Sequence, residues 1–215
     1  MAAAEQCPRR GARLNIERTL MRASFDLDHA KLAADPRFAD IAHELSALSP
    51  INSRDSFNRY CRETCRLWNE AFPNGIGETE QFAKLLNRIE HANDGVIRTG
   101  WGGVVITRNE HPRVEKYLVV RKGGYLALEM HEKKDERLEV REGAGLILWR
   151  PASEQSLTVD VLQPGAEFHF QPGMEHCIIG AEDPLVFERS IDPKGMDQDL
   201  IFIYEPDALA ASAAH

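Results

Sequence analysis

Apolar residues recur at helical spacing in the first hundred residues. Three segments place them three or four positions apart, the spacing of one helix face. The first is predicted to begin at Asp35-Pro36, an N-cap followed by proline, and to stop at Ser49-Pro50. Ser53 begins the second, which ends at the turn of residues 72–75, and the third begins near Thr79. We expect these helices to cover another layer.

After His91 the pattern changes to short runs in which apolar and polar residues alternate. This period of two is typical of strands with one buried face. Glycine and proline turns separate the runs at regular intervals, which favours a barrel or a sandwich. We predict a mainly β fold with three parts: an N-terminal helical segment over residues 1–95, a barrel over 96–206 and a disordered tail over 207–215.

Charge and composition exclude several classes of protein. The 215 residues include 34 acidic and 26 basic residues, and the net charge of -8 disfavours binding to nucleic acid or to an anionic membrane. We find no apolar stretch of about 18 residues that could span a membrane, and four cysteines are too few for a disulfide framework. The sequence therefore predicts a cytoplasmic protein with no nucleic-acid or membrane partner.

Four side chains of metal-ligand type are predicted to converge inside the barrel. Glu129 and His131 lie two positions apart and so share one strand face. The turn of residues 132–135 then reverses the chain and returns Glu136 to the same point. His176, just after the Pro172-Gly173 turn, is placed to join them from another strand. Because inward carboxylates are costly to bury without a cation, we predict one divalent ion: manganese, iron, zinc, nickel or cobalt.

The spacing of these residues resembles the two signature motifs of the cupin superfamily. The first motif is matched by Glu129-x-His131, Glu136 and Gly143, and the second by the Pro172-Gly173 turn with His176. This resemblance implies a double-stranded β-helix, or jelly-roll, barrel. The usual first histidine of the motif is replaced here by Glu129.

Among cupins, residues 101–205 look most like the C-terminal barrel of type II mannose-6-phosphate isomerases, and the likeness is strongest over 113–143 and 164–190. That family commonly has glutamine at the position of Glu129, and the resemblance implies that His131, Glu136 and His176 are metal ligands. The arginine that helps this family to handle a sugar phosphate falls at Phe202, so recognition of phosphate is not implied. The helical first hundred residues lie outside the resemblance.

The leading functional hypothesis is a metal-dependent aldose-ketose isomerase of a sugar or sugar phosphate. In such a reaction the metal polarises an oxygen while a base moves a proton between adjacent carbons. Candidate bases are His169, Lys133 and Glu175, and candidate substrate-binding residues are Tyr125, Lys134 and Arg189. The two lysines also fit an ordinary solvated turn, and His169 also fits a core or surface position.

Three alternatives remain open at this point. The ligand set also suits an iron-dependent cupin dioxygenase or a metal-assisted lyase that acts on a small acid. A non-catalytic, sugar-binding cupin is the third. By analogy with cupins that associate through sheet edges, we also expect a homodimer.

Overall fold

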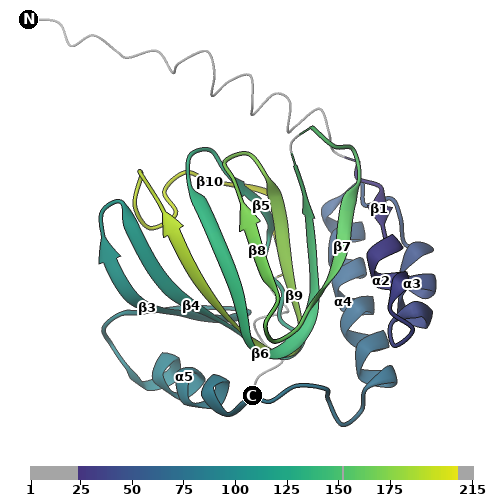
Figure 1. Ribbon diagram of the computed structural model, residues 1–215, viewed down its shortest axis with the longest axis horizontal. Coiled ribbons are helices and arrows are strands. Elements are labelled where there is room, and N and C mark those ends of the chain that lie inside the picture. The colour runs from purple at the N-terminus through teal and green to yellow at the C-terminus, as the bar shows by residue number, and fades with distance from the viewer. Residues whose placement is uncertain (1–23, 152, 208–215) are drawn as a thin grey trace, which may run out of the picture.

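A barrel of β-strands forms the centre of the protein, and helices pack on its outside (Figure 1). The computed structural model describes residues 24–151 and 153–207. The strands are β1 (Leu27–Asp28), β2 (Val96–Thr99), β3 (Gly102–Glu110), β4 (Arg113–Val120), β5 (Leu128–His131), β6 (Asp135–Arg150), β7 (Leu157–Leu162), β8 (Glu167–Phe170), β9 (Glu175–Ile191) and β10 (Leu200–Tyr204).

Two long strands organise the barrel. The 16 residues of β6 and the 17 of β9 pair with each other antiparallel along most of their lengths. Around them the strand order is β1-β7-β6-β9-β4-β3-β2, while β5 pairs with both β9 and β10, and β8 pairs with β6. The predicted mainly β, double-stranded β-helix barrel is confirmed.

The helices are α2 (Ala30–Ala34), α3 (Ala39–Ser46), α4 (Arg54–Ala71) and α5 (Glu80–His91). The last two begin after Ser53 and Thr79, as predicted, and the Ser53 hydroxyl accepts a hydrogen bond from the Ser56 amide. The prediction for the first helix was wrong at its start. Asp35 ends the short helix α2, and α3 begins only at Ala39.

Strand alternation sorts the core into layers. Ile147 and Ile178 point into the barrel, while their neighbours Leu148 and Ile179 point out toward the helices. On that outer face they pack with aromatic side chains of α4 such as Trp68. Helix α5 makes a separate small core against β3 and β4 (Figure 1). The N-terminal helices therefore cover the outside of the barrel, as expected for amphipathic helices beside a sheet.

Two further predictions concern the ends of the chain and the membrane. The predicted tail over residues 207–215 lies, apart from Asp207, outside the described residues. No helix in the described part of the chain is both long enough and apolar enough to cross a bilayer.

Candidate active site in the barrel

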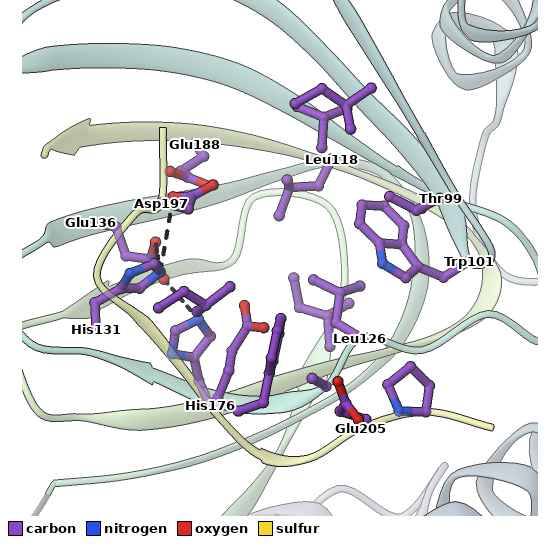
Figure 2. Close-up of a pocket in the computed structure, with 18 of the residues that line it drawn as sticks. Thr99, Trp101, Leu118, Leu126, His131, Glu136, His176, Glu188, Asp197 and Glu205 are labelled. Carbon is purple, nitrogen blue, oxygen red and sulfur yellow. Dashed lines mark ion pairs between the residues drawn. The ribbon is translucent and has the colours of Figure 1, made fainter. Parts of the chain in front are cut away.

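The barrel encloses a cavity of about 530 Å³, a size typical of small-molecule sites. One end of the cavity is charged and the other is apolar. Figure 2 shows His131, Glu136 and Asp197 gathered at the charged end, with Trp101 and Leu126 at the opposite end. A molecule with both polar and apolar surface would find partners for each in this space.

All four predicted ligand residues line this cavity. Strand β5 carries Glu129 and His131, and Glu129 lies directly opposite His176 in the pairing of β5 with β9. Strand β6 contributes Glu136, whose Oε1 is 2.7 Å from Nε2 of His176 and whose Oε2 is 3.8 Å from Nε2 of His131. The spacing of these residues thus correctly predicted that strands β5, β6 and β9 bring acids and imidazoles together.

A second group of charges lies at the same end of the cavity, and of its members only Lys134 was predicted to belong to the site. Lys116, Glu188 and Asp197 also line the cavity, and Lys134 is buried among them. The two carboxylates bridge the two ammonium groups: Lys134 Nζ is 2.7 Å from both Glu188 Oε1 and Asp197 Oδ1, and Lys116 contacts the other oxygen of each. These four residues form a closed and electrically balanced ring.

Asp199 holds the turn between β5 and β6 in place. Its Oδ1 is 2.9 Å from Nδ1 of His131, and its Oδ2 accepts hydrogen bonds from the backbone amides of Lys133 and Lys134 at 2.7 and 3.1 Å. Because a carboxylate only accepts, Nδ1 of His131 carries the proton and the lone pair on Nε2 faces the cavity.

The two cavity glutamates have pKa values shifted in opposite directions. Burial raises the pKa of Glu129 to about 7. Burial also opposes the charge of Glu136, but the adjacent Lys134 and His176 hold the pKa of that carboxyl well below its usual value. Glu129 can therefore exchange a proton near neutral pH while Glu136 stays ionised, a division of roles that suits acid-base chemistry.

The histidines are also different from one another. Burial opposes the charge of His176, yet Glu136 raises the pKa of its imidazole by charge and by a hydrogen bond. Phe170 stacks on the same ring, with centroids 4.3 Å apart. For His131, burial and the neighbouring Lys134 lower the pKa. The protonated form is therefore favoured on His176 and the neutral form on His131.

A divalent ion bound to both His131 and Glu136 does not fit beside the ammonium group of Lys134. An ion about 2.1 Å from both His131 Nε2 and Glu136 Oε2 would lie near the midpoint of their 3.8 Å separation. The Nζ atom of Lys134 is 3.4 Å from that nitrogen and 2.5 Å from that oxygen, which leaves it within about 3 Å of the ion. Two cations in contact would repel strongly.

Two further observations agree with this result. Across residues 24–151 and 153–207, no group of three His, Cys, Asp or Glu side chains has a geometry that could hold a metal ion. A metal-binding histidine usually donates its other ring N–H to a partner, but Nδ1 of His176 has none within the described chain. The four predicted ligands line one end of the cavity, and two of them, His131 and Glu136, contact the ammonium group of Lys134.

The three candidate bases lie elsewhere. His169 is exposed on β8, 3.0 Å from Asp135, because it alternates with the inward Phe168 and Phe170. Lys133 is exposed on the turn. Glu175 is buried but pairs with Arg150, Oε1 lying 3.0 Å from Nη2. In the structure none of the three lines the cavity.

The candidate substrate-binding residues are also redistributed. Arg189 lies on the outer surface, with its guanidinium over the ring of Phe187. Tyr125 is buried on the helix side of the sheet, where its hydroxyl is 2.7 Å from Oδ1 of Asn58. Lys134 does reach the cavity, but its ammonium is already bound by carboxylates. Tyr125 does not share the face of Glu129 because the backbone before β5 is irregular. Leu126 and Ala127 both face the cavity, so the strand alternation is broken there.

Tyr125→Phe should therefore test a structural role. The variant removes the donor to Asn58 from a buried site, and we expect a loss of about 1 kcal/mol in the free energy of unfolding. Urea unfolding measures this loss. Ligand binding in the cavity should not change, and a large loss of binding with normal stability would restore Tyr125 to the site.

Helix α4 contributes to the lining of the cavity. Arg54, at its first turn, lines the cavity together with Glu205 and Pro206. Its guanidinium donates to the backbone carbonyls of both residues, at 3.0 and 2.7 Å. Helix α4 thus supplies part of the cavity wall, a role that the sequence pattern did not indicate.

Solved structures of other proteins align with about half of this chain. No protein-family model and no curated protein sequence matches the chain. The capsular polysaccharide assembling protein CapF from Staphylococcus aureus aligns over 51% of this chain and 32% of its own, with 16% identity and a TM-score of 0.45. Oxalate decarboxylase from Lactobacillus farciminis, solved as a formate complex, aligns over 50% and 32%, with 20% identity and a TM-score of 0.41.

A third similar structure is a smaller protein. An uncharacterised conserved protein from Klebsiella pneumoniae with a double-stranded β-helix domain aligns over 54% of this chain and 90% of its own, with 15% identity and a TM-score of 0.38. The aligned region thus amounts to about a third of the CapF and decarboxylase chains.

Proposed function

We propose that this protein is an enzyme that isomerises a small polyhydroxylated molecule, such as a sugar or sugar phosphate, inside the barrel. The observation that carries the proposal is the placement of Glu129 opposite His176 at the charged end of a cavity of about 530 Å³. The resemblance of residues 113–143 to type II mannose-6-phosphate isomerases supports the same class of substrate.

Aldose-ketose isomerisation requires a base and an acid beside two adjacent carbons. Glu129, with a pKa near 7, takes the proton from the carbon next to the carbonyl and returns it to the neighbouring carbon. The imidazole of His176, whose pKa Glu136 raises, favours by its charge the oxygen on which negative charge develops, and the proton of the second hydroxyl passes to that oxygen in the enediol, which completes the exchange. The apolar walls near Trp101 and Leu126 exclude water from the intermediate.

Proton exchange tests the proposal even when the product is unidentified. Aldoses, ketoses and their phosphates are incubated with the protein in heavy water, and NMR follows deuterium incorporation at the carbon next to the carbonyl. We expect exchange with at least one compound and a loss of about 100-fold or more in Glu129→Gln, which removes the base.

His169→Gln is the matched control, because this side chain lies on the outer surface. It should exchange at the wild-type rate. Failure of every compound to bind or exchange in folded wild-type protein would reject the isomerase proposal. Turnover that consumes oxygen would point instead to a dioxygenase.

A further inference from the structure

The ammonium group of Lys134 is enclosed by carboxylates. Its Nζ lies 2.5 Å from Glu136 Oε2, 2.7 Å from Glu188 Oε1 and 2.7 Å from Asp197 Oδ1. The side chain is 2% exposed. The ammonium group donates one hydrogen bond to Asp197 Oδ1 and one to His131 Nε2, and the carboxylates of Glu136 and Glu188 contact it as ion pairs. The charge of Lys134 is therefore compensated by protein groups and shielded from water.

The turn that carries Lys134 is fixed in this orientation. Asp199 accepts hydrogen bonds from the amides of Lys133 and Lys134 and contacts His131 at the end of β5. A lysine in an ordinary turn would extend into water to keep its charge hydrated. Here Asp199 binds the amides of both Lys133 and Lys134. The side chain of Lys134 enters the barrel, where it contacts carboxylates from other parts of the chain.

The Nζ atom lies beside the position that a metal ion would take, within about 3 Å of it. It lies 3.4 Å from His131 Nε2 and within hydrogen-bond distance of Glu136 Oε2, the two atoms predicted as metal ligands. An ion bound to both atoms would be in contact with the ammonium group. The Lys134 ammonium group and a divalent cation bound to His131 and Glu136 are therefore mutually exclusive.

We propose that the Lys134 ammonium is the resident cation of the barrel, that it keeps divalent metal ions out, and that removing it opens a metal site formed by His131, Glu136, Glu188 and Asp197. These residues supply one imidazole and three carboxylates, a set suited to a hard or borderline divalent ion. This inference goes beyond the proposed isomerase activity, and it concerns metal binding alone.

Metal content of the full chain tests the inference. Wild type, Lys134→Ala and Lys134→Gln are equilibrated with Co²⁺, Zn²⁺ or Mn²⁺, dialysed and analysed by elemental analysis, and Co²⁺ coordination is followed by visible absorption. We expect no stoichiometric metal in wild type, about one ion per chain in the Lys134 variants, and Co²⁺ affinity at least about tenfold higher than in wild type.

Two variants locate the ion. Lys133→Ala changes the exposed neighbour and should behave like wild type. His131→Gln added to Lys134→Ala should lose the bound metal. Because the readout is metal content, a failed sugar screen does not affect the result, and a failed metal test leaves the isomerase proposal standing.

Each remaining outcome decides the question. One ion per chain in wild type, lost in His131→Gln, would overturn the inference, and so would the absence of metal from folded Lys134 variants. If those variants unfold, refolding with Co²⁺ replaces the test: recovery of structure supports the inference, and no recovery shows that a metal cannot replace the ammonium group.

Discussion

Glu175→Gln should lower the free energy of unfolding by about 3 kcal/mol or more and leave ligand binding in the cavity unchanged. Glu175 lies opposite Arg150 in the pairing of β6 with β9, and both carboxylate oxygens contact the guanidinium. Arg150 is 1% exposed and also packs over the ring of Phe25. A neutral amide would leave this buried cation without its counter-charge. Urea unfolding at neutral pH measures the loss.

The double variant Arg150→Met, Glu175→Leu is the matched control. Replacing both members of a buried ion pair with apolar residues of similar volume is often close to neutral, so we expect it to recover most of the lost stability. If Glu175→Gln were as stable as wild type but inactive, Glu175 would be a catalytic residue, as the sequence predicts, and its role as the structural partner of Arg150 would be wrong.

The fold was largely readable from local patterns. Helices α4 and α5 begin after Ser53 and Thr79, the residues that predict their starts. Strand alternation places Cys177 and His176 on opposite faces of β9, as the structure shows. These features depend on neighbours within a few residues, which sequence spacing records well. The two-residue strand β1 pairs in parallel with β7, 130 residues away, and no local signal marks such a strand.

The site was predictable only where its members share a strand or a tight turn. Glu129, His131 and Glu136 follow from strand alternation and a short reversal. Asp197 and Asp199 come from a loop more than 60 residues after the turn that they bind. Nothing in the spacing of distant acids indicates that they will meet, so the sequence indicated a cation at this point but not that Lys134 would provide it.

The strand alternation around His169 already excludes this residue from the cavity. His169 alternates with Phe168 and Phe170, which the same pattern places on the inward face, so its own side chain had to point outward. Residue type suggested a base, whereas the strand period excluded it from the cavity. Where the two kinds of evidence conflict on a regular strand, the geometry of the strand decides.

Glu129→Gln should make the protein more stable at pH 8 by up to about 3 kcal/mol and leave its stability unchanged near pH 4. Burial raises the pKa of Glu129 from 4.5 to about 7. A carboxyl with a raised pKa in the folded state contributes stability that is complete below pH 4.5 and is lost as the pH rises through 7. Glutamine keeps the shape and never ionises, so the variant avoids this loss.

Unfolding curves in urea at several pH values between 4 and 8.5 give the difference directly, and Glu167→Gln, at an exposed position on β8, is the matched control. The sign of the result also bears on the cation in the barrel. If Glu129 were ionised and bound to a metal ion, its replacement would weaken the folded state at pH 8 instead of strengthening it. A less stable Glu129→Gln variant at high pH would therefore mean that this carboxylate is ionised and bound to a cation.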